Sequence, residues 1–256
     1  MKNFYWKTIG YGKINLIVLN GWGFNSKIWF IIINQLNNIF KFYLIDLPGI
    51  GINKHLLPVK IDEISEILYY YMPKNSIWLG WSMGGLITNR FASLYPQNIL
   101  GVINVTSSPC FIKKKKWPGV EEKTIHRFYK SLKKNYYDTI NNFLALQVSG
   151  SKENLKDLKK LKKIISYEDK PDKKTLKNGL EVLLSTDLRL EKNILKIPLL
   201  RIYGALDSLV PKKISKILDK KWPESISIII EKAAHIPFIS HKEQFCHILL
   251  KFIKNL

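Results

Sequence analysis

IWLGWSMGGL, residues 77–86, joins an apolar run to a serine that has glycines on both sides. Residues 77–79 are consecutive apolar residues of the kind that form a strand buried on both faces of a sheet. The glycines around Ser82 allow the backbone to turn sharply, because glycine adopts conformations that other residues avoid. Residues 83–95 then carry apolar side chains at helical spacing. The stretch therefore predicts a strand, a tight turn that carries Ser82, and a helix.

The same alternation of strand and helix extends over most of the chain. The expected strands are the apolar runs at 14–19, 41–46, 76–80, 99–105, 198–204 and 225–231. Segments with helical periodicity lie between them, near 26–38, 61–72, 83–95, 211–220 and 241–254. Strands that alternate with helices form parallel βαβ units. We expect an α/β fold with a mostly parallel central sheet flanked by helices, in which residues 4–9 form an edge hairpin with residues 14–19.

Residues 111–190 interrupt this rhythm, because they contain no strong strand pattern and have a charged, helical character. They open with the lysine run 113–116, and residues 111–177 hold 18 lysines and one arginine against eight acidic residues. The pattern predicts a helical cap, residues 111–190, inserted into a core formed by residues 1–110 and 191–256.

Composition and charge limit the class of protein. With 256 residues, of which 46% are hydrophobic, the chain can bury one sizeable core. Its two cysteines favour a reducing cytoplasm over a disulfide framework, and no run approaches the roughly 18 apolar residues of a membrane span. We expect a cytoplasmic monomer without a signal peptide or membrane anchor.

The formal net charge of +21 has two interpretations. Of the 41 basic residues 37 are lysine, and lysine, asparagine and isoleucine share A/T-rich codons, so a biased genome explains the composition without a partner. The other interpretation is an acidic partner for the cap. A nucleic-acid or membrane binder would spread basic and aromatic residues over the whole chain and would need no active-site residues. We expect neither.

The pentapeptide from Gly80 to Gly84 matches G-x-S-x-G between a strand and a helix, which is the context of a nucleophile elbow. The serine hydroxyl of such a turn stands above the sheet, and the helix N-terminus behind it favours a developing negative charge. The alternative is that Ser82 only caps the helix. A serine hydroxyl is a weak nucleophile unless a base takes its proton, so the elbow predicts a histidine nearby.

His235 is the candidate base, because it follows the last expected strand, where the loop returns above the carboxyl edge of the sheet. We expect the remaining histidines to be solvent or packing residues: His55, His126, His241 and His247. Asp207 follows the strand at 198–204 and is the candidate carboxylate that orients the base. Asp46 also follows a strand, but it precedes the serine, and we expect it to hydrogen-bond local backbone in a turn.

Acyl transfer builds negative charge on the carbonyl oxygen, and backbone N–H groups stabilise it by about 3 kcal/mol per donor. One donor is expected from Met83, directly after the nucleophile. We assign the other to Trp22 in the loop NGWGFN, residues 20–25, although core packing is an alternative role for that side chain. This chemistry requires no metal or organic cofactor.

With these residues, the chain resembles the α/β-hydrolase superfamily over nearly its full length, in the chain order Ser82, Asp207, His235. More closely, it resembles the family of pimeloyl-[acyl-carrier protein] methyl ester esterases of biotin biosynthesis. The matching stretches are NGWGFNSKIW, LIDLPGIG, IWLGWSMGGL, SSPCF, WPG, FLALQ, NGLEVLLSTDLR, YGALDSLVP and KAAHIPFISHKEQFCHIL. FLALQ, SSPCF and the tryptophans Trp78 and Trp81 are the more specific of these.

The resemblance implies a serine carboxylesterase with Ser82 as nucleophile, His235 as general base and acid, and Asp207 as orienting carboxylate. It implies an acyl-enzyme intermediate and no cofactor. The implied products are methanol and pimeloyl-[acyl-carrier protein]. It also implies substrate contacts from Trp22, Ser82, Met83, Phe143, Leu144, Ala145, Leu146, Gln147 and His235. Packing within the cap is the alternative role of Phe143 and Leu146.

Three features depart from the family pattern. Asn20 stands where histidine usually precedes the glycine of the oxyanion loop, and Lys242 follows His241 where proline is common. The cap arginines expected to meet an acidic carrier protein are scarce, and six lysines can substitute for them: Lys130, Lys133, Lys134, Lys156, Lys159 and Lys163. Lysine lacks the bidentate fork of arginine, so carrier binding would be looser and more sensitive to salt.

Two other functions fit the same residues. A short-chain carboxylesterase or thioesterase of broad specificity carries the same triad, and the sequence does not separate it, because the length of the pocket depends on how the cap packs. A non-catalytic ligand receptor of the same fold also retains the triad, but it turns substrate over slowly and holds the product.

Overall fold

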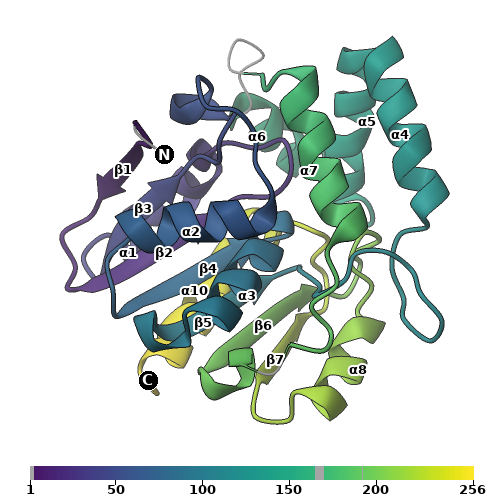
Figure 1. The fold of residues 1–256 in the computed structure, drawn as a ribbon. Helices are drawn as coiled ribbons and strands as arrows, with labels where there is room; N and C mark the ends of the chain where they lie inside the picture. Colours follow the sequence, from purple (N-terminus) through teal and green to yellow (C-terminus); the bar gives the residue numbers. More distant parts are fainter. Residues whose placement is uncertain (1–2, 165–169, 192) are drawn as a thin grey trace.

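The computed structural model describes residues 3–164, 170–191 and 193–256 (Figure 1). At its centre lies a seven-stranded sheet with the strand order β1-β3-β2-β4-β5-β6-β7. The strands are β1 (Trp6–Ile9), β2 (Ile14–Leu19), β3 (Phe40–Ile45), β4 (Ser76–Trp81), β5 (Ile99–Val105), β6 (Leu199–Gly204) and β7 (Ile226–Ile230). Neighbouring strands are parallel except β1 and β3, which are antiparallel. The predicted mostly parallel sheet is confirmed.

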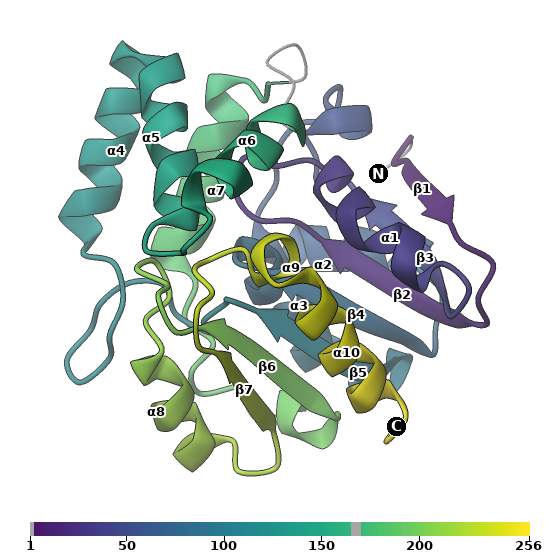
Figure 2. The same ribbon diagram turned by 180° about the vertical axis from the view of Figure 1, so that it is seen from behind.

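Helices cover both faces of this sheet (Figures 1 and 2). The α-helices of the core are α1 (Phe30–Leu36), α2 (Ile61–Tyr71), α3 (Met83–Leu94), α8 (Lys213–Lys221), α9 (Pro237–Ser240) and α10 (Lys242–Ile253). Short 3-10 helices are η1 (Ser26–Trp29), η2 (Gly51–Asn53), η3 (Pro96–Asn98) and η5 (Asn193–Lys196). α2 and α3 pack together on one face, and α1 and α10 pack together on the other. Within the described ranges, no helix is both long enough and apolar enough to span a membrane.

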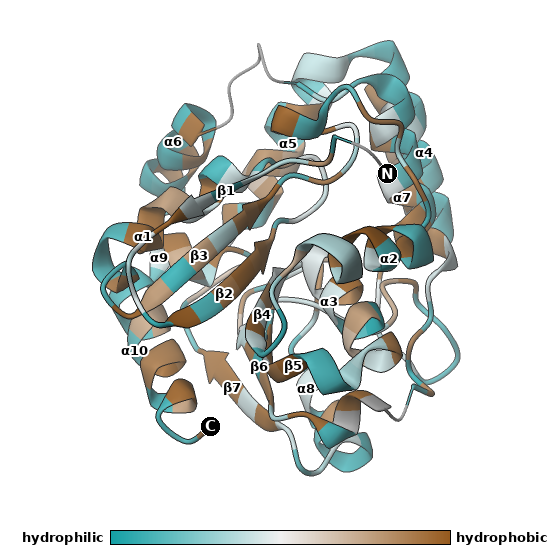
Figure 3. Cartoon of the chain, turned by 60° about the vertical axis from the view of Figure 1, so that its left-hand side comes forward, coloured by the Kyte–Doolittle hydropathy of each residue, from teal (hydrophilic) through white to brown (hydrophobic). Residues whose placement is uncertain are grey.

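The central strands are buried because both faces of the sheet are covered. Every residue of β4 and every residue of β6 is buried, as expected for interior strands of a parallel sheet. Burying a large aliphatic side chain contributes about 1.5–3 kcal/mol, so these strands form the main stabilising core. Apolar residues accordingly concentrate in β2 and β4, whereas α4 on the outside is mostly hydrophilic (Figure 3).

The prediction that residues 4–9 form a hairpin with residues 14–19 is wrong. β1 pairs with β3 instead, because β2 already has β3 and β4 as hydrogen-bonded neighbours on its two sides. The connection between β1 and β2 crosses the start of β3 at very short range, since a Cβ on Gly12 would lie 1.9 Å from the carbonyl carbon of Ile39. The chain thus passes over β3 and leaves β1 as the edge strand.

Among the described residues, four further α-helices lie between β5 and β6 in the sequence, and we call them the cap helices: α4 (Glu122–Lys134), α5 (Tyr136–Val148), α6 (Asn154–Ile164) and α7 (Lys173–Ser185). α5 packs against both α4 and α6, which lie on its opposite sides (Figures 1 and 2). The segments that lead into and out of these helices run together, since the Leu188 N–H donates to the Pro109 carbonyl at 2.8 Å. Residues 165–169, within the predicted cap, lie outside the described residues.

The close approach of α3 to β2 gives a test of the fold. A Cβ on Gly84 would lie 2.4 Å from the carbonyl oxygen of Leu19, so Gly84→Ala has to push the helix away from the strand. We expect it to lower the free energy of unfolding by about 1–3 kcal/mol in urea denaturation, although alanine favours helices.

Gly101→Ala is the control for this experiment. A Cβ on Gly101 would lie 3.1 Å from the half-exposed side chain of Leu256, which can move aside. Equal stability of the two variants would contradict the tight contact between α3 and β2.

Candidate active site

Ser82 occupies the turn between β4 and α3 with φ 53° and ψ −120°, a conformation that residues with side chains rarely adopt. The turn is so tight that it needs glycine at position 80. A Cβ there would lie 2.4 Å from the carbonyl oxygen of Gly84. The Ser82 N–H donates to the Val105 carbonyl at 2.9 Å, and the Ser82 carbonyl accepts a hydrogen bond from the Ser107 hydroxyl at 2.7 Å. β5 and the residues after it therefore hold the strained turn in place.

His235 and Asp207 form a buried pair in which Nδ1 of the imidazole lies 2.7 Å from Oδ2 of the carboxylate. They follow β7 and β6, whose carboxyl ends share one edge of the sheet with the end of β4. Oδ1 of Asp207 accepts the N–H groups of Leu209 at 2.8 Å and Val210 at 3.0 Å, which directs Oδ2 toward the imidazole. The side chains are 2% and 0% exposed. Such a carboxylate favours the tautomer with its proton on Nδ1, leaving Nε2 as the basic atom.

The competing candidates have other surroundings. Oδ1 and Oδ2 of Asp46 accept the N–H groups of Ser26 at 2.6 Å and Ile52 at 3.0 Å, so this carboxylate joins loops in the core. Nε2 of His55 lies 3.0 Å from the backbone carbonyl oxygen of Asn3 at the surface. The imidazole of residue 126 lies 3.5 Å from a glutamate one turn away on α4 and is 58% exposed.

The loop after β2 lies directly against the serine, since a Cβ on Gly21 would lie 3.3 Å from the Cβ of Ser82. Asn20 at the start of this loop is fully buried, and its side-chain amide donates to the carbonyl oxygen of Phe24. This bond closes the loop into a turn in which Gly23 has φ 77°. Asn20 thus shapes the loop that carries one of the two predicted oxyanion donors, and the roles of the two N–H groups stay predictions.

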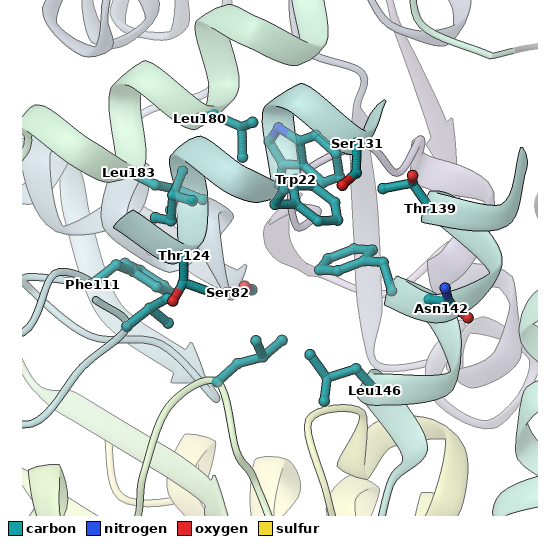
Figure 4. Close-up of a pocket in the computed structure, with 15 residues that line it drawn as sticks. Trp22, Ser82, Phe111, Thr124, Ser131, Thr139, Asn142, Leu146, Leu180 and Leu183 are labelled. Carbon is teal, nitrogen blue, oxygen red and sulfur yellow. The ribbon is translucent and has the colours of Figure 1, made fainter. Parts of the chain in front are cut away.

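A cavity of about 380 Å³ opens above Ser82 (Figure 4). Its walls are mostly apolar and come from the loop after β2, the segment before α4, the cap helices α4, α5 and α7, and the loop after β6. The large side chains in the wall include Trp22, Phe111, Phe128, Phe143, Leu180 and Leu183. The polar groups besides Ser82 are Thr124, Ser131, Thr139 and Asn142. All the described residues that line the cavity are uncharged, so it suits a neutral aliphatic chain.

Four of the residues predicted to contact substrate line this cavity, namely Trp22, Ser82, Phe143 and Leu146. The indole N–H of Trp22 donates to the Leu176 carbonyl at 2.9 Å, and its ring meets Phe143 edge-on with centroids 5.2 Å apart. These contacts hold the tryptophan between the core and the cap helices.

The other predicted contact residues have different positions. Met83 is buried beneath α7, where a Cβ on Gly179 would lie 3.5 Å from the methionine sulfur. Leu144 is buried beside a smaller void of about 20 Å³, and Ala145 is exposed. The backbone carbonyl of Gln147 accepts the backbone N–H of His235 at 3.1 Å, and Gln147 is 1% exposed.

The cavity also includes residues that the sequence did not single out as site residues. Phe128 and Leu180 are examples, from α4 and α7. Residues 124, 125, 128 and 131 share one face of α4, and that helical spacing is visible in the sequence. The spacing does not distinguish a face that lines a cavity from one that packs in a core.

The six cap lysines proposed for carrier docking are all exposed. Three lie on α4 and three on α6, so they form two groups on opposite sides of α5 (Figure 2). The ammonium group of Lys156 also lies 3.1 Å from the carboxylate of Glu153, the residue directly before α6, which neutralises part of the α6 group.

The cysteine thiols are poor competitors as nucleophiles. Burial raises the pKa of the Cys110 thiol, next to the cavity wall, and it raises the pKa of Cys246 to about 11. The thiolate is the reactive form of cysteine, so both side chains stay protonated and unreactive near neutral pH. Among the described residues, no group of three His, Cys, Asp or Glu side chains is arranged to hold a metal ion.

Comparisons with known proteins show the family of the chain. The sequence pattern of the family described as "alpha/beta hydrolase fold" matches residues 14–242. The chain is 44% identical over 257 residues to the pimeloyl-[acyl-carrier protein] methyl ester esterase of Wigglesworthia glossinidia brevipalpis, covering 100% of this chain and 99% of that protein. It is 39% identical over 255 residues, with the same coverage, to the protein of the same name from Yersinia pseudotuberculosis serotype IB (strain PB1/+).

Solved structures share the fold at lower sequence identity. An esterase from Exiguobacterium antarcticum has a TM-score of 0.85 at 18% identity, covering 98% of this chain and 95% of that chain. The enol-lactonase from Burkholderia xenovorans LB400 has a TM-score of 0.83 at 16% identity, covering 98% and 96%. At these identities the likeness shows the fold alone.

The pair of Asp207 and His235 gives a test of the site. In Asp207→Asn an amide oxygen can still accept the loop N–H groups, but the amide N–H₂ then faces Nδ1 and forces the imidazole proton onto Nε2. We expect kcat for p-nitrophenyl acetate to fall about 10⁴-fold while the protein stays folded.

Asp46→Asn is the matched control, because it removes the same charge from a carboxylate that accepts the backbone N–H groups of Ser26 and Ile52 and has no contact with His235 among the described residues. It should lower the melting temperature and leave kcat within about threefold of the unmodified protein. Comparable losses of kcat in both variants would count against an orienting role for Asp207.

Proposed function

Since the chain belongs to the α/β hydrolase fold family, we propose that it is a serine carboxylesterase that hydrolyses the methyl ester of pimeloyl-[acyl-carrier protein]. The products are methanol and pimeloyl-[acyl-carrier protein], which would serve biotin biosynthesis. The apolar cavity of about 380 Å³ above Ser82 carries this proposal, because it suits a neutral aliphatic ester. Full-length relatives at 39–44% identity bear the name of this activity.

The first half of the reaction forms an acyl-enzyme. Nε2 of His235 takes the hydroxyl proton of Ser82 as Oγ attacks the ester carbonyl, and Asp207 stabilises the imidazolium. The N–H groups of Met83 and Trp22 hold the oxyanion of the tetrahedral intermediate. When the intermediate collapses, His235 returns the proton to the methoxy oxygen, and methanol leaves.

The second half releases the acid. His235 takes a proton from water, whose oxygen attacks the acyl carbon, and the second tetrahedral intermediate expels Oγ of Ser82. The proton returns to the serine, and the product is a free carboxylate on the end of the carrier-bound chain. The enzyme ends the cycle unchanged, without a metal or organic cofactor.

The cap helices form one side of the path for the acyl chain. We assign residues 111–190 to a lid, whose helices α4, α5 and α7 supply most of the cavity wall. Thr124, Ser131 and Asn142 are exposed residues of that wall. The thioester end of the substrate would leave the cavity past them, toward a carrier protein bound on the cap lysines.

An esterase of broader specificity is the second candidate. The uncharged lining favours it, because no charged group in the described wall recognises the far end of an acyl chain. A hydrophobic pocket discriminates between chains by only about 1–3 kcal/mol per methylene. Short p-nitrophenyl esters should therefore be substrates too, and the comparison between ester classes decides between the candidates.

The direct test incubates the protein with methyl pimeloyl-[acyl-carrier protein] and follows methanol and the free carboxylate. We expect release of both products in equal amounts, and Ser82→Ala should lower the rate by about 10⁶-fold or to background. Release that survives Ser82→Ala would contradict the assignment of the nucleophile. Hydrolysis of short esters without hydrolysis of the carrier-bound ester would favour the broader esterase.

Carrier docking has its own test. Reversing Lys156, Lys159 and Lys163 to glutamate should raise KM for the carrier-bound ester about tenfold and leave KM for p-nitrophenyl acetate unchanged. The control reverses Lys213, Lys216 and Lys220, which are exposed on α8 of the core and change the net charge equally. Equal effects of the two triple variants would show a general charge effect and no docking on α6.

A further inference from the structure

The backbone carbonyl of His235 accepts hydrogen bonds from two side chains. The indole Nε1 of Trp81 donates to it at 2.9 Å, and the hydroxyl of Thr106 donates to it at 2.8 Å. His235 and Trp81 are each 1% exposed, and Thr106 is 0% exposed. Both bonds are therefore shielded from water. In such a buried site, losing one hydrogen-bond donor has its largest cost in free energy.

Both donors lie at the ends of the strands that hold the nucleophile. Trp81 is the last residue of β4 and directly precedes Ser82. Thr106 directly follows Val105, the residue whose carbonyl binds the Ser82 N–H. Thr106 has φ 42°, and its own N–H donates to the Ile202 carbonyl at 2.7 Å. The position of His235 is thus fixed relative to the same two strand ends that hold the serine turn.

The ring of Trp81 also touches the loop after β2. A Cβ on Gly21 would lie 3.1 Å from this ring, and Phe24 meets it edge-on with centroids 4.8 Å apart. The ring also packs against Phe238, three residues beyond the histidine, with centroids 5.2 Å apart. One side chain therefore contacts both the loop of the predicted oxyanion donor and the loop of the predicted base.

The histidine backbone is bonded at its other polar group as well, since its N–H donates to the Gln147 carbonyl on α5. The imidazole is hydrogen-bonded at Nδ1 to Asp207, and its ring lies against the Trp81 ring with centroids 5.8 Å apart. Asp207 fixes the rotation of the imidazole about its side-chain bonds. It does not fix the position of the His235 backbone that carries the ring. Trp81 and Thr106 supply that second constraint.

We infer that Trp81 and Thr106 are positioning residues that fix the distance between the base and Ser82 by holding the carbonyl of His235. This inference rests on the proposed serine mechanism. A misplacement of about 1 Å in a reacting group costs about 100-fold in rate, so losing one donor affects the chemical step more than binding. Substrate binding depends on the cavity wall, which includes neither residue.

The experiment uses Trp81→Phe and Thr106→Val in the full chain, since each removes a donor and keeps most of the side-chain shape. We expect kcat for p-nitrophenyl acetate to fall about 10- to 100-fold, with KM within about twofold of the unmodified protein. The rate at which an alkyl fluorophosphonate labels Ser82 should fall in parallel, because labelling needs the same base. Thr106→Ser restores the hydroxyl and should restore kcat to within about threefold.

Trp78→Phe is the matched control. Trp78 lies on the same strand, is also 1% exposed, and donates its indole N–H to the Ser76 hydroxyl at 3.1 Å. It stacks on Phe91 rather than on the histidine loop. This variant should lose stability to a similar extent as Trp81→Phe and keep kcat, which separates positioning from general destabilisation.

Three results would overturn the inference. The first is a kcat for Thr106→Val and Trp81→Phe that equals that of Trp78→Phe, and the second is a fall in kcat that Thr106→Ser does not rescue. If Trp81→Phe does not fold, Thr106→Val and Thr106→Ser decide alone. The third is that the unmodified protein hydrolyses p-nitrophenyl acetate no faster than the Ser82→Ala variant. This result would contradict the proposed function as well. It is seen before any positioning variant is compared, so the two failures are distinguishable.

Discussion

The contact between the start of α3 and the ends of β2 and β4 is the constraint on which the site depends. Gly80 and Gly84 have no room for a side chain, because backbone atoms of the neighbouring elements occupy that space. This close approach, together with the hydrogen bonds to Val105 and Ser107, keeps Ser82 in its positive-φ conformation, with the serine lining the cavity. A strained residue persists when its surroundings over-determine it, and strain of this kind marks functional sites.

The remaining parts of the site are placed relative to the same edge of the sheet. Parallel strands bring all their carboxyl ends to one edge, so loops that are distant in sequence converge above it. Asp207 follows β6 and His235 follows β7, and the loop of Asn20 follows β2. The cap helices then close an apolar, uncharged space over the serine. That space suits a neutral ester and gives the proposed carboxylate product no partner of opposite charge in the wall.

The features of the site that could be read in the sequence are those carried by local patterns. The elbow has glycines at fixed spacing, and the order of strands and helices predicts which residues reach the functional edge. Strand pairing is decided by competition for neighbours, so the place of β1 beside β3 has no local signal. The cavity wall is set by how amphipathic helices pack, so Phe128 is recognisable as an apolar-face residue but not as a cavity residue. The bonds of Trp81 and Thr106 to His235 join positions far apart in sequence and appear only in the fold.

The proposed covalent intermediate is the most direct point of test. In the reaction with methyl pimeloyl-[acyl-carrier protein], the acyl chain stays attached to the carrier by its thioester while its other end is bound to Ser82. Acid quenching during turnover should trap a species whose mass is that of the protein plus the carrier-bound pimeloyl group, and peptide mapping should place the bond on Ser82. Turnover without any such species, or a bond to a different residue, would contradict the proposed mechanism.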